Sequence, residues 1–389
     1  MSAVSEPLPR ADKSLAAVHA RRVIFIDLAR ALAVVFMLYG HAVDALLAPA
    51  FRSGLIYSVW QFQRGLTSCL FLLLSGFAFS IATARHWGTQ VSLSPALVKR
   101  LRRFGLFVLL GYSLRIPVTP LTRLPGASDA QWRSFMEVDV LQLIGVTFIG
   151  VQLLVLATRT RQAFMVVTLL VATAAIFVTP FLWSVDWLRM LPLSLASYLS
   201  PATGSQFPLF PWAAFILIGA GLGQIYATWG AGRLGDYANR VLLLPGVVLL
   251  PIAFALDLGQ EKLFGVGPFA FVPGNVLLRT GSCFVILGLI AHASRRLSKL
   301  PHVFGAVAQE SLLIYFVHLC IVYGSIWSAG LAQVYGSTRT PAQMLFIVVL
   351  LIAAMTLLAW YWNWWKHTRP TWARWQSAAV GLALFLRLM

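Results

Sequence analysis

Long apolar segments alternate with short polar connections along almost the whole chain. A helix that crosses a bilayer needs about 20 mostly apolar residues, and ten segments approach or exceed that length. They cover residues 23–47, 59–84, 103–118, 138–157, 162–182, 207–228, 240–257, 270–293, 303–325 and 342–363. No internal repeat and no low-complexity linker separates them. The pattern therefore predicts an all-α integral membrane protein, a single bundle of about ten transmembrane helices.

The composition agrees with this fold class. Of the 389 residues, 59% are hydrophobic and only 11% are charged, which lies far outside the balance of a soluble domain. The three cysteines, Cys69, Cys283 and Cys320, lie in apolar stretches without C-x-x-C spacing. They indicate neither a disulfide framework nor a zinc site.

The net charge of +18 reflects orientation in the membrane. Lysine and arginine concentrate in alternate connections, which places both termini in the cytoplasm by the positive-inside rule. Anionic lipid accounts for the excess of cations, so no nucleic-acid partner is expected. We expect residues 1–22 to form a disordered cytoplasmic tail, 23–363 the bundle, and 364–389 a cytoplasmic or interfacial tail. The expected location is a bacterial-type inner (plasma) membrane.

Polar residues in the first apolar segment follow a helical spacing. They recur at intervals of three and four residues, which places them on one face of a helix. The stripe consists of Asp27, Arg30, Val34, Met37, His41 and Asp44. Arg30 and His41 are separated by about 16 Å along the axis. Ionisable groups within a membrane are costly and usually face the protein interior, so this stripe is a candidate site.

Polar residues of other segments match this stripe in depth. An outer level is predicted to contain His41, Asp44, Arg64, Arg279 and His318, and an inner level Asp27, Arg30, Glu310 and Ser75. Two simpler interpretations remain open. Asp27 and Arg30 could form a structural ion pair, and His318, with Tyr315 three residues before it, could be a satisfied core histidine.

Two further motifs have structural interpretations. The sequences "LSGF" in the second segment and "GAGLG" in the sixth predict close helix packing through small residues. The sequence "FPLFPW" predicts either a structural lip or an aromatic sugar platform.

The polar residues suggest group transfer. A histidine beside carboxylates and arginines can act as a general base, because its pKa lies near the working pH. Arginines suit phosphates, so the donor is expected to carry phosphate. No metal is expected.

The sequence resembles the membrane-bound acyltransferases of the acyltransferase 3 superfamily and the related catalytic domain of heparan-alpha-glucosaminide N-acetyltransferase. The resemblance rests on "FIDLARALAVVFMLYGH", "CLFLLLSGFAFS", "VDVLQLIGV", "FPLFPWAAFILIGAGLG" and "SLLIYFVHL", in this order. It implies a cytoplasmic acyl-CoA donor, with acetyl-CoA the most suitable, and a sugar or glycan acceptor.

The resemblance also implies roles for individual residues. His41 would be the catalytic base, and Arg30 would hold the donor or the architecture. Ser75, Arg279 and His318 would line the site. Asp44 joins the catalytic set, and the supporting set comprises Asp27, Arg64, Glu310 and Tyr315. The heparan-alpha-glucosaminide branch often has asparagine at the position of His41, so the branch stays open.

Two functions follow from different classes of protein. The first is an acyltransferase in which His41 deprotonates a hydroxyl or amine that attacks the acyl thioester, directly or through an acyl-enzyme. The alternative is a transporter or flippase for a glycan or lipid-linked sugar, although secondary transporters usually show internal repeats. The sequence leaves open the acceptor, the acyl chain length and a homodimer.

Overall fold

The computed structural model describes residues 23–264 and 273–389, and within them every regular element is a helix. The chain is an all-α membrane protein, as the hydrophobic pattern predicts. The predicted tail of residues 1–22 lies outside the described residues.

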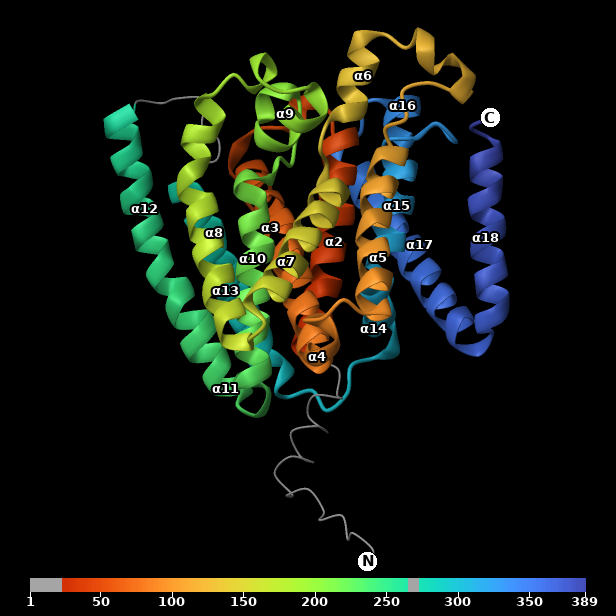
Figure 1. Cartoon of the computed structure of the whole chain (residues 1–389). Coiled ribbons are helices and arrows are strands. Elements are labelled where there is room, and N and C mark those ends of the chain that lie inside the picture. Colours follow the sequence, from red (N-terminus) through yellow and green to blue (C-terminus); the bar gives the residue numbers. More distant parts are fainter. Residues whose placement is uncertain (1–22, 265–272) are drawn as a thin grey trace, which may run out of the picture.

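The long helices form an upright bundle (Figure 1). They are α2 (Ile24–Leu46), α3 (Gly54–Arg85), α5 (Pro95–Ser113), α7 (Val140–Thr158), α8 (Arg161–Ser184), α10 (Leu209–Thr228), α12 (Leu244–Phe264), α13 (Pro273–Ser294), α15 (Ser311–Val322), α17 (Pro341–Thr368) and α18 (Pro370–Leu386). The short helices are α4 (Trp87–Gln90), α6 (Asp129–Met136), α9 (Leu193–Leu199), α11 (Leu234–Tyr237), α14 (His302–Gln309) and α16 (Leu331–Tyr335). We call the end where α2 begins the inner end and the end where α2 finishes the outer end. Helices α4, α11 and α14 gather at the inner end, and α6, α9 and α16 at the outer end.

The number of spans is slightly lower than the ten predicted. Among the described residues, eight helices are long and apolar enough to cross a membrane, or nine if the pair α14 and α15 is one span. The predicted segment 103–118 belongs to α5, which begins earlier, at Pro95. Its first turns carry Lys99, Arg100, Arg102 and Arg103, and these charges remove it from the set of apolar helices.

The predicted segment 303–325 is also not one straight helix. It is broken between α14 and α15, which meet at a bend of 73°. Glu310 lies at the break, after the last residue of α14 and before the first of α15. The bend brings the start of α15 against the middle of the bundle.

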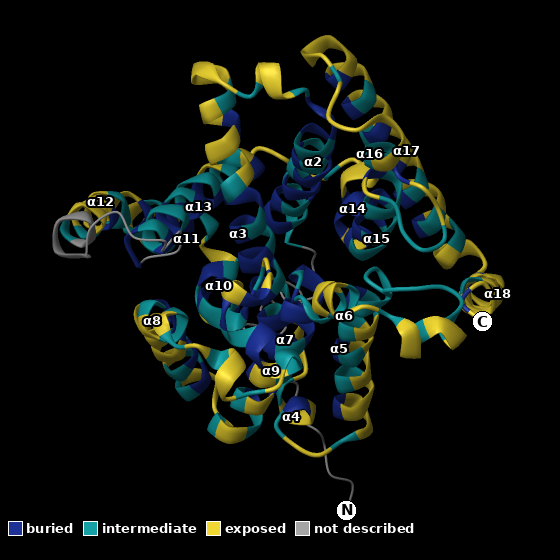
Figure 2. Cartoon of the chain, turned by 90° about the horizontal axis from the view of Figure 1, so that it is seen from above, coloured by how far each residue is buried: buried dark blue, intermediate teal, exposed yellow. Residues whose placement is uncertain are grey.

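Glycines allow the closest contact of the core, between α3 and α10. A Cβ on Gly76 would lie 1.9 Å from the carbonyl oxygen of Ile216, and one on Gly219 would lie 2.0 Å from that of Leu73. No side chain fits between these backbones. The prediction that "LSGF" and "GAGLG" mediate packing is confirmed. Figure 2 shows the resulting centre, where α3, α7 and α10 are mostly buried, and the exposed margins at α12 and α18.

The aromatic segment before α10 also packs inward. Phe210 interrupts the helical backbone at the start of α10, while Trp212 and Phe215 are buried. The rings of Phe207 and Trp212 lie 4.6 Å apart between centroids. Burial of Trp212, and its contact with the half-buried Phe207, favour the structural interpretation of "FPLFPW".

Helix α18 differs from the expected cytoplasmic or interfacial tail. It turns back beside α17 and runs towards the outer end (Figure 1). There Leu388 accepts a hydrogen bond from the backbone N–H of Leu121, and Arg387 donates to the carbonyl of Trp327. These contacts hold the last turn of α18 at the outer end, because Leu121 and Trp327 belong to outer connections.

Candidate functional site

The stripe on α2 faces α15, and the two helices bring two histidines together. The ring centroids of His41 and His318 lie 5.3 Å apart, with the ring planes at 46°. His41 is half-buried, whereas His318 is fully buried. The structure therefore joins two of the three residues that the sequence predicts to be catalytic.

His318 has a fixed arrangement of its ring nitrogens. Its Nδ1 lies 2.8 Å from the carbonyl oxygen of Ile314. Since a carbonyl only accepts, Nδ1 carries the proton and donates it. The buried Nε2 makes no hydrogen bond with a described residue. The neutral ring thus presents Nε2 as an unpartnered acceptor in the interior of the bundle.

Tyr323 is a site residue that the sequence reasoning missed. Its Oη lies 3.1 Å from Nδ1 of His41, and its ring packs edge-on against that imidazole at 5.6 Å between centroids. Partial burial, aided by the carboxylates of Asp44 and Asp139, raises the pKa of the Tyr323 phenol. Tyr323 follows the last residue of α15, so helical spacing from His318 could not place it on the site face.

Asp44 pairs with an arginine instead of a histidine. Its Oδ2 lies 2.8 Å from Nη2 of Arg64 on α3, and both side chains are partly exposed. Arg64 also lies over the ring of Trp60, with 5.8 Å between its Cζ and the ring centroid. The predicted outer level thus contains an ion pair one turn beyond His41.

Arg30 belongs to a second polar group near the inner end. Its Nη2 donates to Oγ of Ser311 at 3.1 Å. Asp27, one turn earlier in α2, attracts the guanidinium, while Arg103 of α5 repels it. Both guanidinium groups add positive charge near the inner end, which favours an anion there.

Arg279 and Ser75 each donate a hydrogen bond to a backbone carbonyl of α3. Nη1 of Arg279 donates to the carbonyl of Gly65 at 3.3 Å, on α3. Ser75 donates to the carbonyl of Phe71 in its own helix at 2.8 Å. The structure gives both residues contacts with the backbone of α3.

Glu310 contacts α17, and Tyr315 contacts the ring of His318. Glu310 is 5% exposed, lies 2.6 Å from Nζ of Lys366 and accepts from Asn363 at 3.0 Å. These partners come from α17, so Glu310 ties the α14–α15 break to α17. The buried Tyr315 packs edge-on against His318, with 5.8 Å between ring centroids.

A further ion cluster at the outer end was also missed. Arg115, just after α5, bonds to the carboxylates of Glu137 and Asp139. Asp139 lies in "VDVLQLIGV" and caps α7 by accepting from the N–H of Val140 at 2.7 Å. Its charge acts on Tyr323, so the cluster belongs to the surroundings of the histidine pair. The acidic residue before α7 was its sequence signal.

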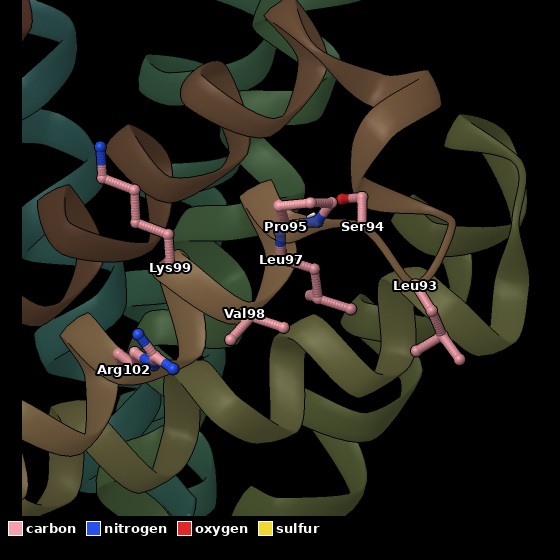
Figure 3. A pocket seen from close by; sticks show the side chains of 7 residues that line it. All are labelled: Leu93, Ser94, Pro95, Leu97, Val98, Lys99 and Arg102. Carbon is pink, nitrogen blue, oxygen red and sulfur yellow. Dashed lines mark hydrogen bonds between the residues drawn. The ribbon is translucent and has the colours of Figure 1, made fainter.

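A pocket of about 710 Å³ lies at the inner end beside the start of α5. Figure 3 shows Lys99 and Arg102 on one side of this helix and Leu93 on the other. Ser94 caps α5 by accepting from the N–H of Leu97. The pocket contains no histidine or carboxylate that could act as a base, but its two cations suit an anion.

No group of three histidine, cysteine or carboxylate side chains close enough to hold a metal ion occurs within residues 23–264 and 273–389. The geometry instead offers imidazoles for proton transfer and guanidinium groups for an anion.

Comparison with known families gives a match over the first part of the chain. The family described as "Heparan-alpha-glucosaminide N-acetyltransferase, catalytic" matches residues 22–247, more than half of the chain. Arg30 and His41 lie within the matched range, whereas His318 and Tyr323 follow it. A search of curated proteins found no match.

Proposed function

The chain belongs to the family of the heparan-alpha-glucosaminide N-acetyltransferase catalytic domain, and we propose that it transfers an acetyl group from acetyl-CoA to a sugar. Membership implies acyltransferase activity in a membrane. The proposed acceptor group is the amine or hydroxyl of a glycan, and the proposed location is a bacterial-type inner membrane. His41 is the proposed base.

The observation that carries this proposal is the contact of His41 with His318. Proton transfer needs a nitrogen that is free to accept, and Nε2 of His318 has no described partner. Nδ1 of His41 lies against the hydroxyl of Tyr323. If this Nδ1 carries the proton and donates to Tyr323, then Nε2 of His41 is unprotonated, as a general base requires.

In the proposed reaction His41 acts as the base. His41 Nε2 accepts a proton from the acceptor amine or hydroxyl as the nucleophile attacks the thioester carbonyl. A C–N or C–O bond forms, the C–S bond breaks, and the electron pair leaves on sulfur. The imidazolium then returns its proton to the thiolate. His318 and Tyr323 orient the base.

The cationic side chains of α2 and α5 near the inner end suit the phosphates of the donor. Arg30 lies about 16 Å from His41 along α2, towards the inner end, and the positive charge of Arg103 acts on its guanidinium. Lys99 and Arg102 share the same side of α5 as Arg103. Guanidinium groups bind phosphates with charge-assisted hydrogen bonds. We propose that the phosphates of acetyl-CoA lie here while its thioester reaches the histidines.

The first test is a transfer assay with protein in lipid nanodiscs. Deuterated acetyl-CoA is supplied with methyl α-glucosaminide, and the product is weighed by mass spectrometry. A gain of one deuterated acetyl group that disappears in His41→Ala supports the proposal. Wild-type activity in that variant would remove His41 as the base.

A second assay, with the protein reconstituted in vesicles and a labelled sugar, separates the transporter or flippase alternative. If the vesicle-reconstituted protein moves the labelled sugar across the bilayer and its mass stays unchanged, the alternative replaces transfer. A mass gain by one acetyl group excludes pure transport.

A further inference from the structure

A second pocket, of about 330 Å³, lies between α2, α14, α15 and α17. Leu28, Leu32, Val35 and Leu38 line it from α2, at intervals of three and four residues. Along the helix these residues span about 15 Å. Thr356 supplies the only polar side chain among the described lining residues. We call this the α2–α17 pocket.

The lining of the α2–α17 pocket approaches the histidine pair along two helices. Leu38 lies one turn before His41 on α2, and Ile314 lies one turn before His318 on α15. The carbonyl of Ile314 accepts the hydrogen bond from Nδ1 of His318. The wall of the pocket is therefore bonded directly to a proposed site residue.

The opposite side of the histidine pair is polar. One turn beyond His41 lies the ion pair of Asp44 with Arg64, and Tyr323 places its hydroxyl at the same level. The pocket lining on α2 is thus apolar from Leu28 to Leu38, and the two imidazoles and then the ion pair of Asp44 follow towards the outer end. This order matches an amphiphile whose head lies at the outer end and whose tail points into the membrane.

The α2–α17 pocket is bordered by partly exposed residues of α14. Val303 and Phe304 of α14 line it and are 40% and 42% exposed. An alkyl chain could enter there from the bilayer without crossing water. The amides and phosphates of a CoA moiety would lose their hydrogen bonds in such a lining, so the apolar pocket does not suit that part of the donor.

We propose that the α2–α17 pocket binds the alkyl chain of a lipid-linked acceptor, holding its sugar against His41 and His318. The inference rests on the proposed acetyl transfer and names the class of acceptor. Burial of methylene groups is favourable, so a few bound methylenes suffice for a tenfold change in KM.

The test compares methyl and decyl α-glucosaminide as acceptors, with the protein in nanodiscs. We expect a KM for the decyl compound at least tenfold below that for the methyl compound. Ala31→Phe fills the α2–α17 pocket, because Ala31 lines it, and should bring the ratio of the two KM values towards one. Ala354→Phe is the matched control, since Ala354 lies on the exposed side of α17.

Photolabelling of the unaltered protein provides a second measurement that does not depend on the fold of a variant. A decyl α-glucosaminide with a diazirine at the chain end should label peptides that contain Ile314 or Met355. Unlabelled decyl compound should suppress this labelling, and methyl α-glucosaminide should not. Labelling by a diazirine phospholipid that the decyl compound cannot displace would assign the pocket to bulk lipid and overturn the inference.

The remaining outcomes separate the two proposals. Acetyl transfer with equal KM values for both glucosaminides would overturn the lipid-linked acceptor and leave the transferase intact. Specific labelling of the α2–α17 pocket without acetylation of either compound would support an alkyl site and overturn the proposed function.

Discussion

The imidazole of His318 lies 5.3 Å from that of His41 between ring centroids, while its Nδ1 is held by the carbonyl of Ile314. The hydrogen bond to Ile314 fixes which nitrogen of His318 faces the bundle interior. In this buried ring the N–H of Nδ1 donates to the backbone, and Nε2 has no described partner. Such a ring is suited to proton transfer. The pair is therefore the place where changes should affect rate more than fold.

His41→Ala should lower kcat by about 10²–10⁴, the usual contribution of a general base. The half-buried ring can be removed at modest cost to packing, so the melting temperature should change little. Steady-state acetyl transfer and thermal unfolding measure the two effects. His302→Ala is the control, because His302 is exposed at the start of α14. Equal loss in both variants would argue against a special role for His41.

Tyr323→Phe should reduce kcat up to about tenfold, because one hydrogen bond contributes about 0.5–1.5 kcal/mol. The lost hydroxyl bonds to Nδ1 of His41, so the ring would lose its orientation and not its basicity. Tyr361→Phe, on the exposed side of α17, should leave kcat unchanged. A wild-type kcat in Tyr323→Phe would mean that the base is oriented by packing alone.

Arg30→Gln and Arg103→Gln should each raise the KM for acetyl-CoA, about tenfold or more, because each removes a cation from the proposed phosphate site. Added salt should weaken donor binding in the wild type. Thermal-shift titration with acetyl-CoA and free CoA measures binding without turnover. Arg189→Gln is the control, since that side chain is 86% exposed. Unchanged donor binding in both variants would show that the phosphates of acetyl-CoA bind elsewhere.

Glu310→Gln should destabilise the protein by about 1–3 kcal/mol, because a buried carboxylate loses charge-assisted bonds. Its partners Lys366 and Asn363 hold α17 against the α14–α15 break. Asp186→Asn breaks an exposed pair with Arg189 and should cost at most about 1 kcal/mol. Unfolding temperatures in detergent compare the two. Equal shifts would show that the break is held by other contacts.

Gly76→Ala should lower stability strongly, because the added Cβ would meet the Ile216 carbonyl at 1.9 Å. Relief requires α3 and α10 to move apart. Gly150→Ala is the matched substitution, since no atom lies within 4 Å of that Cβ, and alanine in a helix is favoured by about 1 kcal/mol over glycine. Thermal unfolding should therefore shift in opposite directions. A stable Gly76→Ala protein would contradict the close packing of α3 and α10.

Several features could be predicted from the sequence because they depend on local pattern. Apolar length predicted the helices, and spacing placed Arg30, His41 and Asp44 on one face of α2. The depth argument correctly brought His318 of α15 to the level of His41. Apolar length alone predicts one or two more spans than the described residues contain. One reason is that the charges at the start of α5 lie within the helix and not before it.

Hydrophobic length and helical periodicity are properties of contiguous residues, so the all-α membrane architecture and the polar stripe on α2 can be predicted from the amino-acid sequence. The partner of each polar residue, in contrast, depends on how the helices pack. This packing pairs Asp44 with Arg64, Glu310 with Lys366, and His41 with Tyr323. Matching depth leaves the rotation of each helix about its own axis undetermined. Side-chain packing, glycine contacts such as that of Gly76 with Ile216, and the bend between α14 and α15 fix that rotation.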